Sequence, residues 1–251
     1  MARKILGQHF LKNNYYIEKI INSFEIPPPA NVLEIGPGKG NITFPLIEKG
    51  YNLFAIEKDK KFEPYFKGKN LKIFFEDALN FPKNIGEFLK ENNIKIVFSN
   101  LPYSCGTKIF LRYLPYLNCI KQMVLMFQYE VGEKILSMGS LFVITNLIAK
   151  VEVICKVPSE AFFPKPKVES VLLSFKKKGT LNFPYDKFLK FLALSFKHPR
   201  KTLYNNLIIS YNSNIIKNVF DDKKLKMNLR AHQLMPQDFL EIFKKLEGNF
   251  K

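Results

Sequence analysis

Short apolar runs alternate with longer segments in which apolar residues recur every three or four positions. The runs predict strands at residues 32–35, 53–56, 71–75, 94–98 and 123–127. Helical patterns lie between them, reaching about Lys49, near 84–92, to about Leu114 and over 129–149. Because continuous apolar strands are typical of sheets buried on both faces, this alternation predicts a doubly wound, mostly parallel α/β sheet.

The rhythm breaks after the last of these helices. Two apolar runs, 151–157 and 168–175, follow one another with only a proline-rich linker, 158–167, between them. Without a helix to cross the sheet, two such strands are expected to form an antiparallel pair at one sheet edge.

The two ends of the chain are helical. Asn13 or Asn14 can cap a helix whose apolar stripe includes Ile17, Ile20 and Phe24. Beyond Gly179 the pattern is helical to the end of the chain. We therefore predict an α/β domain at 1–178 and a small all-α domain at 179–251.

The net charge of +17 indicates a polyanionic partner, because basic side chains that neutralise phosphates release counterions. Only four of the 39 basic residues are arginine, so a compositional bias toward lysine is an alternative explanation. The excess is densest in residues 176–251, which hold 16 basic and six acidic residues.

The three cysteines form no C-x-x-C pair, and the three histidines show no metal-ligand spacing. We therefore expect reduced thiols, no disulfide framework and no metal site. No apolar run approaches the ~20 residues of a membrane span, and the first residues do not form a signal peptide. We expect a cytoplasmic monomer without a membrane partner.

Four polar or glycine features follow successive predicted strands. Gly36, Gly38 and Gly40 form a G-x-G-x-G turn after the first strand, with Asn41 where the dinucleotide pattern would need a third glycine. Glu57 ends the second strand and could accept hydrogen bonds from ribose hydroxyls. Asp77 ends the third and could accept from an adenine amino group. Since ligands of open α/β sheets bind at the carboxyl ends of strands, these features predict a site for an adenosine-type cofactor.

The fourth strand ends at Asn100-Leu101-Pro102-Tyr103. Pro102 lacks an N–H and favours an extended Leu101, so the turn exposes carbonyl groups beside an amide and an aromatic ring. Such a turn can accept hydrogen bonds from an exocyclic amine and stack on the ring that carries it.

These motifs resemble class I S-adenosylmethionine methyltransferases. Residues 7–11, 34–38, 100–103, 162–168 and 200–207 are similar to the rRNA adenine N6-dimethyltransferase family, most of all its small-subunit, KsgA-type branch. The resemblance implies S-adenosyl-L-methionine as cofactor and a Rossmann-like methyltransferase domain followed by a helical RNA-binding domain. It also implies methylation of two adjacent adenosines near the 3′ end of 16S rRNA to N6,N6-dimethyladenosine, during small-subunit biogenesis.

Roles are carried over to matching positions only. The cofactor-binding residues implied are His9, Leu11, Gly36, Glu57, Asp77 and Asn100. For catalysis, the Asn100 side-chain oxygen and the Leu101 carbonyl would accept the two N6 hydrogens, and Tyr103 and Phe162 would stack on the base. Phe163 is the alternative stacking residue, and a core contact is the alternative role of Phe162. Leu6 and Ser104 depart from residues that are frequent in the family.

Three rival functions stay open at this point. A large-subunit (23S) rRNA dimethyltransferase of the macrolide-resistance type often has Ile where this chain has Leu101, and residues 200–203 favour the small-subunit enzyme. A non-catalytic ribosome-assembly factor would not need the complete series of acids. A DNA adenine methyltransferase would need a sequence-reading domain, and none is apparent. Lys165, Lys167 and residues 197–201 are the candidate RNA contacts.

Overall fold

The computed structural model describes residues 8–179 and 181–248. It divides into two compact units, Met1–Gly132 with Lys150–Lys177, and Glu133–Ala149 with Lys178–Lys251. The expected domains differ from these units in one respect, because residues 133–149 belong to the same unit as the C-terminal helices. The reason is α7 (Ser140–Ile148), which is apolar on most of its surface and packs against α8 (Tyr185–Ser195) and α11 (Pro236–Glu247).

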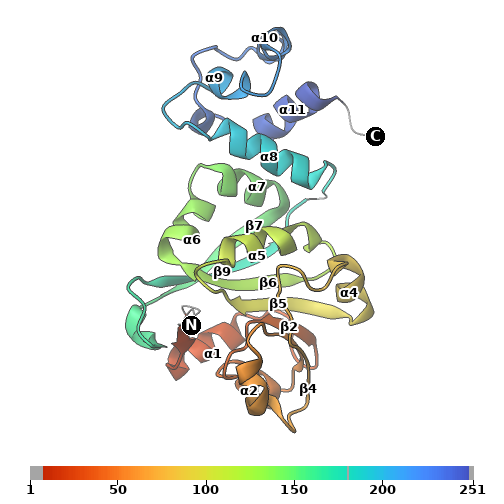
Figure 1. Cartoon of the computed structure of the whole chain (residues 1–251), viewed down its shortest axis with the longest axis vertical. Helices are drawn as coiled ribbons and strands as arrows, with labels where there is room; N and C mark the ends of the chain where they lie inside the picture. Colours follow the sequence, from red (N-terminus) through yellow and green to blue (C-terminus); the bar gives the residue numbers. More distant parts are fainter. Residues whose placement is uncertain (1–7, 180, 249–251) are drawn as a thin grey trace, which may run out of the picture. The chain divides into compact units, whose positions relative to one another are not determined.

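A seven-stranded sheet, drawn in Figure 1, forms the centre of the first unit, with strand order β4-β3-β2-β5-β6-β9-β7. Its strands are β2 (Asn31–Ile35), β3 (Asn52–Ile56), β4 (Leu71–Phe74), β5 (Ile94–Asn100), β6 (Gln122–Gln128), β7 (Ala149–Val157) and β9 (Ser170–Lys177). The first five in this list pair in parallel, and β9 pairs antiparallel with β6. The mostly parallel sheet with an antiparallel edge is therefore confirmed.

Short helices connect the parallel strands. They are α1 (Asn14–Asn22), α2 (Thr43–Glu48), η1 (Lys60–Phe62), α3 (Glu63–Phe66), α4 (Ile85–Glu91), α5 (Gly106–Tyr113) and η2 (Leu114–Tyr116), followed after β6 by α6 (Tyr129–Leu136). Asn13 caps α1 by accepting a hydrogen bond from the Tyr15 N–H, so the expected start of this helix is confirmed.

Both faces of the sheet are covered at its centre, which explains why β2, β5 and β6 are almost entirely buried. On one face α1 and α2 pack Ile20 and Leu46 into a buried cluster with Val32 and Phe98. On the other face α5 places Phe110 against Phe127 and Phe175, with ring centroids 5.5 and 4.9 Å apart. Such a sheet leaves its strand ends as the place for polar chemistry.

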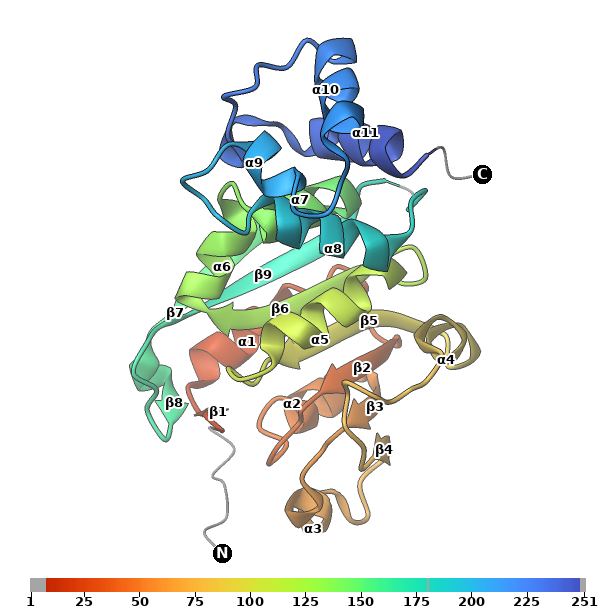
Figure 2. The same ribbon diagram turned by 45° about the horizontal axis from the view of Figure 1, so that its top comes forward.

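The segment before α1 forms a second, small sheet. In it β1 (Phe10–Leu11) pairs antiparallel with β8 (Phe162–Phe163), which follows η3 (Ser159–Ala161) in the proline-rich linker (Figure 2). The Lys12 N–H extends this pairing by donating to the Ala161 carbonyl at 2.9 Å. We call residues 8–11 the arm.

The second unit is helical and contains α7, α8, α9 (Leu203–Leu207), α10 (Ser213–Asp222), η4 (Ala231–Gln233) and α11. Its core is aromatic, since Phe188, Phe191, Phe239 and Phe243 are all buried. Asn206 is buried among them with 1% of its surface exposed. Its amide hydrogen-bonds Ser195 and His198, and so holds the loop between α8 and α9.

Among the described residues, no single helix has the length and apolar composition of a membrane span. One bent pair, α6 with α7 at 65°, meets those two criteria only when its helices are taken together.

Candidate active site

The expected site residues converge where four neighbouring parallel strands end. Ile35 lies opposite Ile56, and Ile56 opposite Phe74, so the segments that follow β2, β3 and β4 leave the same sheet edge. Asn100 closes β5 at that edge. Two adjacent pockets open there and share Gln8, Gly36, Glu57 and Pro102 in their walls.

The glycine turn after β2 forms one wall. Gly36 has φ +75°, a conformation that side chains with a Cβ rarely adopt, and a Cβ built there would meet nothing within 4 Å. Gly38 has φ +57°, and a Cβ on it would lie 2.7 Å from the ring of Phe10. The turn therefore leaves open space beside Gly36, which fits the close approach of a ligand expected there.

Glu57 lies across the pocket from this turn and is fixed by two backbone donors. The N–H of Gly38 donates to Oε2 at 3.0 Å, and the N–H of Asp59 donates to Oε1 at 2.8 Å. Burial raises the pKa of this carboxyl, while the two N–H bonds act in the opposite direction. Each carboxylate oxygen has a second lone pair, so Glu57 can still accept from a pair of hydroxyls.

Glu34 is a second buried acid in the same wall. The Thr43 hydroxyl donates to its Oε2 at 2.7 Å. Burial raises the pKa of Glu34 to about 7, and the nearby charge of Glu57 adds to the increase. Two acids in one pocket wall favour a ligand that donates hydrogen bonds.

Asp77 lies in the second pocket, beside Glu57 and Ile56. Its Oδ2 accepts from Lys58 Nζ at 2.7 Å, and its Oδ1 accepts from the Leu79 N–H at 3.0 Å. These contacts, that of Lys58 above all, hold the pKa of Asp77 below its ordinary value. An ionised carboxylate in a pocket with apolar walls fits the amino group of an adenine ring.

The turn after β5 contributes hydrogen-bond acceptors and an aromatic ring to the first pocket. Asn100, Leu101 and Tyr103 all line the first pocket, and the Leu101 N–H is held by the Met126 carbonyl at 3.2 Å. The Tyr103 hydroxyl hydrogen-bonds the Ser170 hydroxyl at 2.9 Å, and burial raises its pKa. The cofactor-type pocket and the amine-accepting turn are thus brought together at one place.

The arm closes the first pocket from outside the sheet. His9 and Leu11 line it, and the His9 ring lies 5.3 Å from the Tyr103 ring at an interplanar angle of 32°. His9 Nδ1 donates to the Pro164 carbonyl at 2.7 Å. Gly7, the first residue of this motif, lies outside the described residues, as does Leu6.

Phe162, to which the family resemblance gives a stacking role, is buried in this structure. Only 2% of its surface is exposed, and it packs in the core cluster with Leu11 and Ile17. Side chains alternate across β8, so Phe163 points outward and is 64% exposed. In this conformation Phe162 makes the core contact that was its alternative role, and neither ring of β8 lines either of the two pockets.

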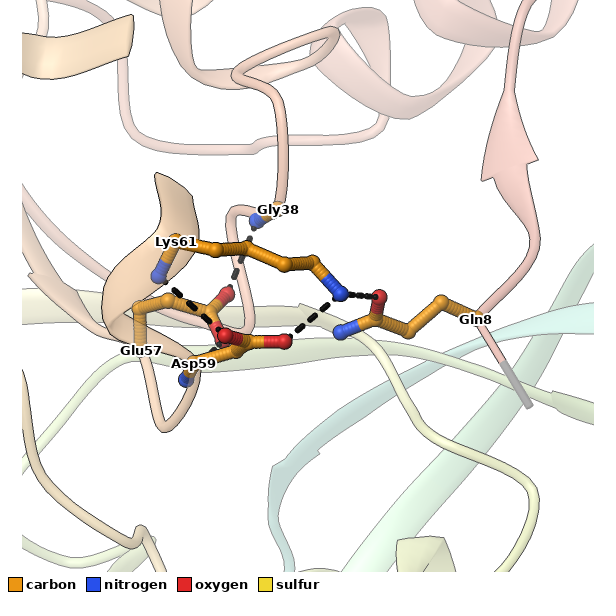
Figure 3. A network of polar contacts seen from close by, with 5 residues as sticks. All are labelled: Gln8, Gly38, Glu57, Asp59 and Lys61. Carbon is orange, nitrogen blue, oxygen red and sulfur yellow. Dashed lines mark hydrogen bonds and ion pairs between the residues drawn. The ribbon is translucent and has the colours of Figure 1, made fainter. Parts of the chain in front are cut away.

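The sequence patterns did not indicate several residues that contact the arm or the walls of the pockets. Figure 3 shows Lys61 joining Asp59, at 2.6 Å, to Gln8, at 3.0 Å, next to the Glu57–Gly38 contact. Asn41 Nδ2 donates to the Leu11 carbonyl at 2.8 Å. The sequence marked Asn41 only as the residue that replaces a glycine of the dinucleotide pattern, and did not indicate its contact with the arm. No local pattern indicated Lys61, since its partner Gln8 is 53 residues away.

Comparison with known proteins identifies the family. The model of the ribosomal RNA adenine dimethylase family matches residues 1–247. The ribosomal RNA small subunit methyltransferase A of Malacoplasma penetrans is 35% identical over 94% of this chain and 85% of its own length. The protein of the same name from Campylobacter hominis is 34% identical over 98% and 96%.

Solved structures support the same fold. The dimethyladenosine transferase from Plasmodium falciparum has a TM-score of 0.74 and 25% identity, covering 95% of this chain and 98% of its own. The 23S rRNA methyltransferase ErmE has a TM-score of 0.65 and 20% identity, covering 95% and 100%, which shows a shared fold alone. With a class I methyltransferase sheet, and with its acids and its amide-bearing turn at one edge, the chain belongs to the ribosomal RNA adenine dimethylase family of rRNA methyltransferases.

Proposed function

We propose that this protein transfers methyl groups from S-adenosyl-L-methionine to N6 of two adjacent adenosines near the 3′ end of 16S rRNA, giving N6,N6-dimethyladenosine during small-subunit biogenesis. The observation that carries this proposal is the position of Asn100, an amide in the wall of the same pocket as Gly36 and Glu57. The small-subunit assignment is supported by the names of the relatives that match nearly the whole chain.

The residues of the two pockets fit this cofactor. Glu57 would accept from the ribose hydroxyls and Asp77 from the adenine amino group, while the turn at Gly36 leaves room for close contact. His9 and Leu11 would complete the wall of the first pocket. When bound, the cofactor supplies a methyl group already activated by its sulfonium, so the protein's remaining tasks are positioning and electrostatic stabilisation.

The target amine is a poor nucleophile, because its lone pair is delocalised into the purine ring. Asn100 Oδ1 and the Leu101 carbonyl would accept the two N6 hydrogens, which localises that lone pair and aims it toward the cofactor pocket. Tyr103 would stack on one face of a flipped or single-stranded base. Phe163, which is 64% exposed, is the ring that we propose for the other face.

The product of one transfer is still an amine, so a second transfer to the same nitrogen is chemically possible. The RNA backbone would be held by lysines, with Lys167 and residues 197–201 as exposed candidates. Lys165 is also exposed but forms an ion pair with Glu160. We propose that the enzyme acts as a monomer in the cytoplasm, where small subunits assemble.

The test compares two RNA substrates. The protein is incubated with labelled S-adenosylmethionine and either undermethylated small subunits or large-subunit rRNA, and the nucleosides are analysed. We expect N6,N6-dimethyladenosine in small-subunit RNA, and loss of turnover with retained folding for Asn100→Ala. Label in large-subunit RNA alone would support the 23S alternative. Cofactor binding without any label would support a non-catalytic assembly factor.

A further inference from the structure

One hydrogen bond joins the arm to the turn after β5. Asn100 Nδ2 donates to the backbone carbonyl of His9 at 3.1 Å. A carbonyl oxygen can only accept, so this contact sets which end of the amide faces the arm. The other end, Oδ1, is then the one left to face a donor from the pocket that Asn100 lines.

The arm is itself held by side chains from the cofactor side of the pocket. Asn41, directly after the glycine turn, donates to the Leu11 carbonyl at 2.8 Å. Lys61, in η1 after β3, donates to the Gln8 side chain at 3.0 Å and contacts Asp59, as Figure 3 shows. The position of the His9 carbonyl therefore depends on the same two segments that supply Gly36 and Glu57.

We propose that the His9 backbone carbonyl is a positioning group for methyl transfer, which holds the Asn100 amide with Oδ1 toward the target amine. Asn41 is the side chain that keeps this carbonyl in place. The inference rests on the proposed function, in which Asn100 Oδ1 accepts an N6 hydrogen. If the Asn100 amide were turned by 180°, its N–H₂ group would face the N–H₂ group of the target adenine, and neither could accept. We expect that orientation to be inactive.

The size of the effect follows from the strength of one neutral hydrogen bond. Such a bond favours one amide orientation over the other by roughly five- to tenfold. Without the support of the arm the two orientations become about equally populated, so the rate of methyl transfer should fall by about twofold. Cofactor affinity should change less, because it depends mainly on Glu57, Asp77 and the glycine turn.

The decisive variant is Asn100→Asp, which keeps the shape and the acceptor but loses the donor. An ionised carboxylate would face the His9 carbonyl with negative charge, whereas the neutral acid can donate O–H to it and still offer a C=O to the amine. We expect single-turnover methylation of undermethylated small subunits to be at least ~100-fold below wild type at pH 8. The ratio of variant to wild-type rate should then rise about tenfold per unit as the pH falls toward 5.5.

The ratio of the Asn100→Asp rate to the wild-type rate reports the ionisation of the new carboxyl group alone. The other titratable groups that line the first pocket, His9, Tyr103, Glu34 and Glu57, are present in both proteins. Cofactor binding is measured at each pH by calorimetry. A ratio that stays flat with pH, or an activity at pH 8 within threefold of wild type, would overturn the proposal while leaving the proposed function intact. Wild-type protein that labels no RNA would instead contradict both.

A second variant tests the arm without touching the catalytic turn. Asn41→Ala should lower the single-turnover rate about twofold with Asn100 present, and should not change it measurably in the Asn100→Asp background at pH 8. This non-additivity is expected if Asn41 acts through the amide. The matched control is Asn52→Ala, which removes an exposed amide at the first residue of β3 that is bonded to Asn31, and it should change neither rate. Equal effects of Asn41→Ala in both backgrounds would overturn the proposal.

Discussion

Lys58 Nζ lies 2.7 Å from Oδ2 of Asp77, the carboxylate proposed to accept the adenine amino group of the cofactor. The lysine side chain is 61% exposed, whereas the aspartate is 28% exposed in the pocket wall. The ammonium of Lys58 therefore already occupies the acceptor that is proposed for the cofactor. In that role, Asp77 would have to share this ion pair or lose it when the cofactor binds.

Replacing Lys58 with Met should strengthen cofactor binding slightly. Exposed ion pairs contribute about 0–1 kcal/mol, so the gain is at most about fivefold in Kd. The gain should shrink at high salt, where the ion pair of the wild-type protein is already screened. Calorimetric titration with S-adenosylmethionine at low and high salt measures both effects. Weaker binding by the variant would mean that Lys58 orients Asp77 for the cofactor and does not compete with it.

The strand ends were predictable because parallel strands deliver their carboxyl ends to one edge, whatever the loops between them do. The prediction that Glu57, Asp77 and Asn100 lie at one edge of the sheet required only this rule. The arm was not predictable from local patterns, because its contacts with Asn41, Lys61 and Pro164 join residues 30 or more positions apart. The two phenylalanines of β8 were ambiguous for a different reason. Adjacent strand residues point to opposite sides, and only the pairing with β1 decides which one is buried.

The Glu34→Gln variant should remove a pH-dependent loss of stability. The pKa of Glu34 is about 7 in the folded protein, above its ordinary value of 4.5, so the folded state binds more protons between these values. Its contribution is therefore fully present below about pH 4.5 and is lost as the pH rises through 7. At pH 8 the cost of ionising the buried Glu34 is of the order of 3 kcal/mol.

Urea unfolding at pH 5 and pH 8 provides the measurement. The glutamine can still accept from the Thr43 hydroxyl but carries no charge to desolvate. The variant should therefore exceed the wild-type stability at pH 8 by up to about 3 kcal/mol, and by clearly less at pH 5. An equal difference at both pH values would show that Glu34 is not the titrating group.

The two neighbouring phenylalanines of β8 should separate stability from substrate binding. Phe162→Ala should cost about 3–5 kcal/mol of folding free energy, because it leaves a cavity in the core cluster. Phe163→Ala should change the melting temperature little but weaken RNA methylation, since base–aromatic stacking contributes ~1–3 kcal/mol. Thermal melting and KM for small subunits are measured for both. Unchanged methylation by Phe163→Ala would remove it as the stacking residue.

In the helical unit, the buried amide of Asn206 should shape the basic loop between α8 and α9. Its Oδ1 accepts from the His198 N–H at 3.2 Å, and its Nδ2 donates to the Ser195 and His198 carbonyls at 3.0 and 3.2 Å. Asn206→Ala leaves the His198 N–H and the Ser195 carbonyl without this partner, while the His198 carbonyl still accepts from the Lys201 N–H, so the change should cost about 2–3 kcal/mol. Residues 197–201 are all exposed, so the same variant should also weaken binding of small-subunit RNA a few-fold.

The neighbouring Asn205 offers a matched control for this amide. It is exposed, and it contributes its backbone N–H to the Thr202 cap of α9, so Asn205→Ala removes an amide without removing a loop contact. Melting and RNA binding are compared across a range of salt concentrations, because lost phosphate contacts reduce the salt dependence of binding whereas a general loss of folding does not. If the Asn206→Ala and Asn205→Ala variants had the same melting temperature and bound RNA with the same salt dependence, the loop would keep its shape without the Asn206 amide.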